Sequence, residues 1–188
     1  MSMMHCSLLS LGCAFGFAPA GDQTTLTALR ALKIAQRRLR PEVRSKLLSV
    51  SSARTDATLA PEAWRFVFLD LETSGHCRIV TVAAKASSEH PDTVEAFSSA
   101  KAENVASLVP IPQNKLLVDS TKALEEVRGS SKLKGVQSAQ YRLVQPRTGK
   151  EPLWHLQFFA EGPEPIVDFE VTAKTGAIQL VGKDAKAD

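Results

Sequence analysis

The clearest alternation of apolar and polar residues runs from Pro152 to Leu180. Every second side chain is apolar from Trp154 to Ala160 and again from Val167 to Val171. A period of two places these side chains on one face of a pleated sheet and the intervening residues on the other. Gly176 follows the second run and accepts the positive φ of a tight turn. We therefore predict an antiparallel hairpin, a turn and a short final strand, with one packed face and one wet face.

The same alternation occurs earlier in the chain, where Trp64, Phe66 and Phe68 share one predicted strand face. A return strand follows at Arg78–Ala84, after a turn at Glu72–Gly75. Further strands are predicted at Lys46–Arg54 and Thr93–Phe97, and a short helix is predicted at Ala100–Leu108.

A helical period of apolar residues precedes each set of strands. The first helix is predicted from a cap at Thr24 or Thr25 to about Arg40, because Pro41 disfavours continuation. The second begins at Asp119 or Ser120, stops at Gly129 and leads into a strand at Leu133–Gln145.

These elements predict an α+β fold of two tandem α-β-β-β units, each a helix packed on a small antiparallel sheet. The matching tryptophan positions suggest an internal duplication. The predicted organisation is a first unit at residues 21–109, a proline-containing linker at 110–116, a second unit at 117–182 and a polar tail at 183–188. Whether the units share one sheet or form two stays open from the sequence.

The second unit resembles the PepSY domain. The resemblance is carried by Lys122–Val127 on the helix, Tyr141–Leu143 and Trp154–Leu156 on two strands, and Val167–Ile178 with its Thr-Gly turn. It covers about 60 residues. The first unit is similar in outline and has Lys85-Ala86-Ser87 where the second has its Thr-Gly turn.

The resemblance implies a helix across a small antiparallel sheet, of cystatin-like or β-lactamase-inhibitor-like shape. Such domains occur in exported or cell-envelope bacterial proteins and are thought to bind or restrain proteases. The family shares no catalytic residues, so the resemblance implies a non-enzymatic module.

The first twenty residues differ in kind from the rest, because they contain no Lys, Arg, Asp or Glu. The apolar run Cys6–Ala18 is short for a bilayer but suits a signal peptide, and Ala18-Pro19-Ala20 offers a cleavage site. We expect export to the periplasm or beyond, with lipid attachment at Cys13 as the alternative. No later stretch is apolar enough to cross a membrane. A chain cut after Ala20 keeps only Cys77, which excludes an internal disulfide.

Candidate chemistry is sparse in this sequence. It has no HExxH, CxxC, phosphate-binding glycine loop or GxSxG motif, and we predict no catalytic residue, cofactor or metal. His76 and Cys77 are neighbours, but adjacent strand residues point to opposite faces and would pair poorly. Asp70, Glu72 and His76 surround one turn, and a solvated hairpin end explains them better than a cation site.

The wetter face of the second unit is the predicted contact surface for a protein partner. Its residues are Arg142, His155, Gln157, Phe159, Asp168 and Glu170.

A second hypothesis places an anionic membrane or a nucleic acid on the basic side of the first helix. The residues concerned are Arg30, Lys33, Arg37, Arg40 and Arg44. A solvated face is the preferred interpretation of this stripe. The net charge of +3 is modest, and no aromatic residues interleave with the arginines, which disfavours nucleic acid.

Overall fold

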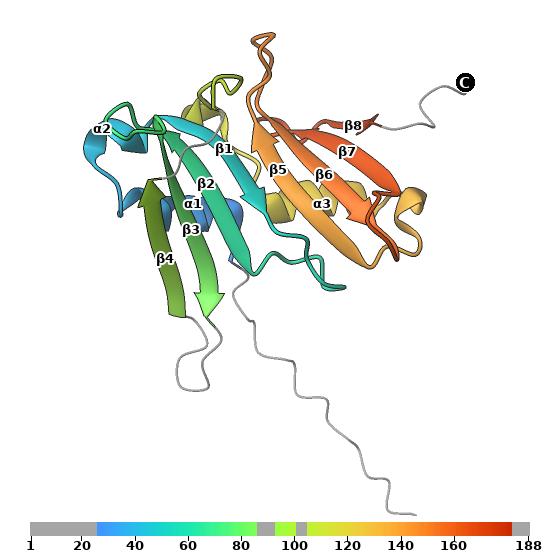
Figure 1. The fold of residues 1–188 in the computed structure, drawn as a ribbon. Helices are drawn as coiled ribbons and strands as arrows, with labels where there is room; N and C mark the ends of the chain where they lie inside the picture. Colours follow the sequence, from blue (N-terminus) through green and yellow to red (C-terminus); the bar gives the residue numbers. More distant parts are fainter. Residues whose placement is uncertain (1–25, 86–92, 101–104, 182–188) are drawn as a thin grey trace, which may run out of the picture.

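The computed structural model describes residues 26–85, 93–100 and 105–181 and forms a single antiparallel sheet with few helices (Figure 1). The predicted α+β class is confirmed at this level. The helices are α1 (Ala28–Gln36), α2 (Pro41–Arg44) and α3 (Ser120–Arg128), with 3-10 turns at Gln113–Lys115 and Ser131–Leu133. The strands are β1 (Leu47–Ser52), β2 (Ala63–Leu69), β3 (Cys77–Lys85), β4 (Thr93–Ala100), β5 (Ser138–Val144), β6 (Leu153–Phe159), β7 (Val167–Thr172) and β8 (Ile178–Val181).

The eight strands follow the order β4-β3-β2-β1-β5-β6-β7-β8. Two four-stranded meanders therefore meet where β1 pairs antiparallel with β5, through Ser49–Val144, Val50–Leu143 and Ser51–Arg142. This pairing answers the question that the sequence left open: the strands of both halves share one sheet.

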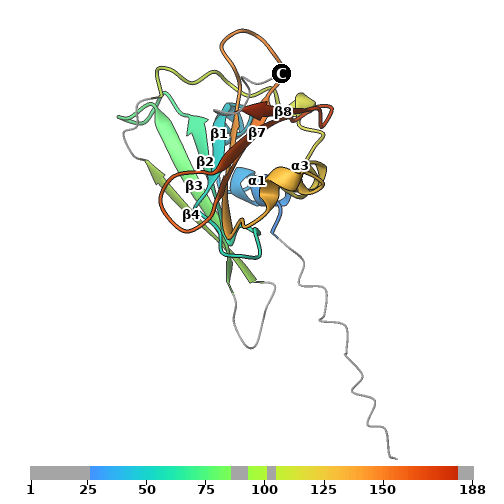
Figure 2. The same ribbon diagram turned by 90° about the vertical axis from the view of Figure 1, so that its right-hand side faces the viewer.

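Both longer helices lie against the same face of this sheet (Figures 1 and 2). α1 contacts β2 and β3, and α3 contacts β6. One apolar core lies between helices and sheet, and it includes both tryptophans, Tyr141, Phe66 and Phe158. The predicted facing of the Trp-led strands is confirmed, because Trp64 and Trp154 are both fully buried.

Corresponding contacts tie each tryptophan to the entry of a helix. Trp64 Nε1 donates to the carbonyl of Leu26 at 2.7 Å, and Trp154 Nε1 donates to that of Val118 at 2.9 Å. Leu26 and Val118 each lie one residue before an N-cap. The two indole rings meet edge to face with centroids 6.1 Å apart.

The two helix starts also meet each other. Asp119, the N-cap of α3, accepts from the backbone N–H of Ser120 at 2.6 Å and from that of Leu29 in α1 at 3.0 Å. Ser120 Oγ accepts from Ala28 N–H at 3.0 Å. These side chains satisfy N–H groups that the first turn of each helix leaves without intrahelical partners.

The first helix is shorter than predicted at both ends. Its cap is Thr27, whose hydroxyl accepts from Arg30 N–H, whereas the predicted caps Thr24 and Thr25 lie outside the described residues. It ends at Gln36, and Pro41 begins α2 as a first-turn proline instead of simply ending a longer helix. Pro41 suits that position because a helix start has no use for the missing N–H.

Two other predicted elements are wrong, one in its type and one in its start. The helix expected at 100–108 is absent from its described part, because Ala100 belongs to β4 and residues 105–108 form a turn. The strand expected from Leu133 begins only at Ser138, after a 3-10 turn. The remaining positions of that predicted helix, 101–104, lie outside the described residues, as do the predicted signal peptide and the polar tail from 183 onward.

The segment predicted as a linker packs onto the body of the sheet. Ile111 is 1% exposed within the main core, and its N–H donates to Leu47 O at 2.7 Å. Leu116 and Val118 are buried in the same core. Two prolines flank Ile111 and keep the backbone extended at this point.

Candidate protein-contact surface

The face of the sheet opposite the helices carries a row of polar residues across its centre. Strand register aligns Arg65, Ser51, Arg142, His155 and Glu170 on neighbouring strands β2, β1, β5, β6 and β7. They share a face because each is one residue away from a core side chain on its own strand. The sequence predicted Arg142, His155 and Glu170 for this face. It did not place Ser51 and Arg65 beside them, because that requires the β1–β5 pairing.

Arg142, His155 and Glu170 form the charged centre of this row. His155 Nδ1 lies 3.4 Å from Glu170 Oε1, and both side chains are partly exposed. Partial burial and the nearby charge of Arg142 lower the pKa of His155, and the Glu170 carboxylate opposes them. The imidazole is therefore neutral at pH 7, and the face presents a cation, a hydrogen-bonding ring and an anion in sequence.

Gln157 and Asp168 form the next polar pair toward the β6–β7 turn, where the register sets them opposite each other. Burial raises the pKa of Asp168, and a hydrogen bond from Gln157 partly offsets the effect. Asp168 Oδ1 is buried and has no hydrogen-bond partner among the described residues. A buried acceptor without a partner is costly, so a donor from a bound molecule would stabilise it.

Phe159 lies at the end of the same face, but it is not the exposed aromatic that its position suggested. Only 5% of it is accessible, because the Arg54 guanidinium covers the ring at 4.2 Å from its centroid. Arg54 Nε donates to Ser138 Oγ at 2.6 Å, and its other nitrogens donate to the carbonyls of Gly162 and Ala160. A partner would meet Arg54 at this place before it met Phe159.

A recess of about 470 Å³ adjoins Glu170 at the other end of the face. Its lining includes Leu153, Thr172 and Gln179, together with Glu151. Glu151 accepts ion pairs from Lys115 and Lys174, each at 3.5 Å. No pattern in the sequence indicated this recess, since three strands and the β5–β6 turn form it together.

The outer face of β1–β3 is apolar toward Leu48 and Cys77, although Ser51 and Arg65 continue the polar row onto β1 and β2. Leu48, Val67, Cys77 and Ile79 form a second buried cluster there, with Val105 and Leu108 packed against it. Cys77 is buried in this cluster, and His76 lies in the turn before it, at φ 51°. The polar surface is thus concentrated on β5–β7.

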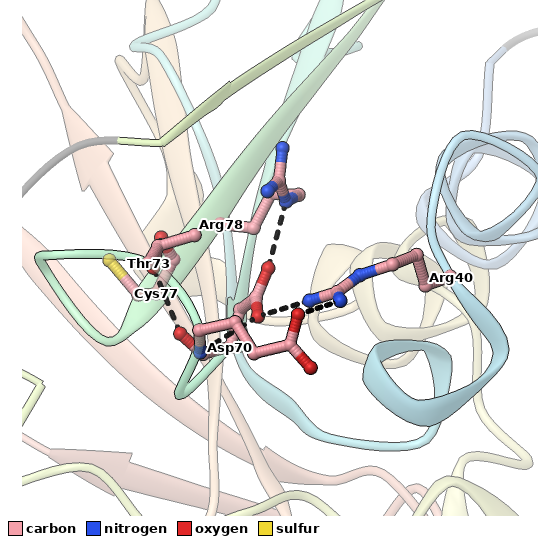
Figure 3. Close-up of polar contacts among 6 residues, drawn as sticks. Arg40, Asp70, Thr73, Cys77 and Arg78 are labelled. Atoms are coloured by element: carbon pink, nitrogen blue, oxygen red, sulfur yellow. Dashed lines mark hydrogen bonds and ion pairs between the residues drawn. The ribbon is translucent and has the colours of Figure 1, made fainter.

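The predicted basic residues all have exposed side chains on or after α1, although Arg40 and Arg44 make polar contacts within the fold. Arg40 bonds to Glu72 and, at 2.8 Å, to Asp70 (Figure 3). Arg44 Nε donates to the carbonyl of Leu39 at 2.8 Å. The stripe is therefore partly neutralised at its α2 end.

Asp70 is the centre of an ionic cluster at the end of β2. Its side chain is 1% exposed and lies between Arg40 and Arg78, with Arg78 Nε 3.0 Å from Oδ2 (Figure 3). Burial favours the neutral acid. Bonds from Arg78 and from Glu72 N–H, together with the charge of Arg40, outweigh it and hold the pKa of Asp70 below its ordinary value.

That cluster also explains the acidic residues around the turn. Both carboxylates that could have joined His76 at a cation bond to Arg40 instead. No group of three or more potential metal ligands occurs within residues 26–85, 93–100 and 105–181.

Comparisons with known proteins add no relative. No family model matches the chain, and no curated protein or solved structure was found to be similar to it. No helix in the described part of the chain is long and apolar enough to cross a membrane.

Proposed function

We propose that this chain is a non-enzymatic, exported binding module that holds a protein partner on the helix-free face of β5–β7. The observation that carries the proposal is the row Arg142–His155–Glu170, which stays partly exposed beside a recess. Mixed charge, one acceptor without a partner and an adjoining hollow suit a protein surface of complementary charge and shape.

We further propose that the fold consists of two tandem PepSY-like units that arose by duplication and share one sheet. The support is the match between the Trp64–Leu26 and Trp154–Val118 bonds. The strand positions correspond as well, because each tryptophan lies on the second strand of its meander, between residues of the first and third strands. Trp64 lies between Ser52 and Val82, and Trp154 lies between Leu143 and Val171. This arrangement is the β-lactamase-inhibitor-like alternative that the resemblance implies, and a restrained protease is one partner that fits it.

The proposal assigns binding and not catalysis to the polar face for a physical reason. Its polar side chains contact one another: His155 faces Glu170, and Gln157 donates a hydrogen bond to Asp168. Cys77, the nucleophile that the sequence placed beside a histidine, lies in the apolar cluster of the other half.

Site-specific photo-crosslinking in the native host tests the surface directly. A photoreactive residue at Gln157 should crosslink to an envelope protein, whereas one at Lys132, which is exposed beyond α3, should not. Arg142→Glu should abolish the crosslink, and Lys132→Glu, which changes the charge equally, should preserve it. Equal crosslinking from both positions, or a crosslink unaffected by Arg142→Glu, would refute the surface.

The alternative function is peripheral binding to an anionic membrane through α1. It is favoured by the exposure of Arg30, Lys33 and Arg37 on one side of that helix. Binding to vesicles that contain anionic lipid should fall steeply with salt and should be lost in Lys33→Glu with Arg37→Glu. Lys132→Glu with Lys134→Glu provides a control of equal charge change, and salt-independent or absent binding would exclude this function.

A further inference from the structure

A second recess, separate from the polar face, lies on the helix side between the β1–β2 loop and α3. It has a volume of about 350 Å³ and is lined mainly by Leu26, Leu59, Pro61, Leu124, Arg128 and Tyr141. This volume falls in the range of small-molecule sites, which are largely apolar with few polar groups.

The recess is preformed, because its loop is held in place by several bonds. Tyr141 Oη donates to Leu59 O at 2.7 Å, and Leu59 takes a positive φ of 61°. Thr55 and Ala139 exchange two bonds of 2.8 and 2.9 Å, which fasten the loop to β5. Rigid walls lower the entropic cost of binding a ligand.

Arg128 supplies the cationic group at this recess. Burial raises the pKa of Tyr141, and the positive charge of Arg128 opposes that rise, so the guanidinium acts on the phenol at the floor. Among the described residues the structure gives Arg128 no ion pair. The other charged group of the lining, Glu125, faces Lys122 at 3.6 Å.

We propose that this recess binds a small molecule with an apolar body and a single carboxylate. The apolar body would lie against Leu26, Leu59 and Leu124, and the carboxylate would accept hydrogen bonds from Arg128. A guanidinium matches a carboxylate in geometry and charge. The site is independent of the proposed protein-contact surface, because its residues lie on the opposite side of the sheet.

Octanoate and octanamide, which differ only in the charged head, form the matched probes. Trp64 stacks edge to face on Tyr141 at 5.8 Å, so its fluorescence should report occupancy. Titration calorimetry should give octanoate an affinity about tenfold above that of octanamide, because a charge-assisted bond to Arg128 is stronger than a neutral one. No octanoate binding at millimolar concentration, or equal affinities, would overturn the proposal.

Four variants locate the effect. Arg128→Gln should remove the preference for octanoate, and Arg128→Lys should keep part of it while preserving the last-turn cation of α3. Lys134→Gln removes the same charge away from the recess and should leave the preference intact. Ala60→Phe should fill the recess and weaken both probes, with near-ultraviolet circular dichroism confirming the fold. A preference that persists in Arg128→Gln, or unchanged affinities in Ala60→Phe, would place the binding elsewhere.

Discussion

The two halves of the sheet have similar helix-side faces and different outer faces. On the helix side, Trp64 and Trp154 make corresponding bonds to helix entries. On the other side, Val67 is buried beneath the 105–108 segment, whereas Gln157, at the corresponding place on β6, is partly exposed. The helix-side face therefore packs into the core in both halves. The outer face is open to a partner at this place only in the second half.

The two buried tryptophans test how similar the halves are, and replacing them should lower stability the most. Trp64→Ala and Trp154→Ala should each lower the free energy of unfolding by about 4 kcal/mol, because each removes a fully buried ring and leaves a carbonyl without its donor. Urea denaturation of the two variants measures the effect. A cost below about 1 kcal/mol for either would mean that only one half depends on its tryptophan.

The next prediction exchanges residues between the two outer faces. Val67→Gln should cost about 2 kcal/mol, because it places an amide in an apolar cluster. The reciprocal Gln157→Val should cost less, about 1 kcal/mol, because it removes only the hydrogen bond to Asp168, and it should weaken binding of the partner. Similar stability changes for the two variants would contradict the contrast between the faces.

The first half holds a carboxylate, Asp70, that is 1% exposed between two arginines, whereas Glu151 in the second half is 33% exposed between two lysines. Asp70→Asn should cost about 2 kcal/mol at pH 7, since two partly exposed arginines lose a buried partner. The folded pKa is depressed, so this contribution is present above the ordinary value of 3.8 and is lost as pH falls through the folded value. Unfolding curves of both proteins should therefore converge below pH 3.8, and a constant gap would show that Asp70 acts through shape and not charge.

The smallest effect concerns His155 on the polar face. Its folded pKa lies below 6.5, so the folded state resists protonation and stability should decline as pH falls below 6.5. His155→Gln should flatten this part of the pH profile of the melting temperature. The exposed His76→Gln is the matched control and should leave the decline in place, and a decline that persists in His155→Gln would assign it to another group.

The sequence was informative where local periodicity decides the structure. Alternation placed Trp154, Leu156 and Phe158 in the core, and the Lys-Thr-Gly turn was located correctly, with Gly176 at φ 78°. Asp119 was one of the two residues predicted to cap the second helix. Thr27 was missed in favour of its neighbours, because three threonines offer nearly equal caps and tertiary contacts choose among them.

The site was less accessible to sequence reasoning, because it depends on contacts between distant segments. For example, Arg54 from the first half lies over the ring of Phe159 from the second half. The recess beside Leu59 likewise combines the β1–β2 loop with α3, which are far apart in the sequence. Contacts between such distant segments leave no periodic pattern in the sequence.

The pairing of β1 with β5 has a consequence for how the chain reaches its native state. Its partners are separated by roughly ninety residues, and such distant pairings slow folding. During synthesis the first meander emerges complete while β1 still lacks its neighbour on one side. The unpaired edge of β1 is exposed during that time to pairing with strands of other chains.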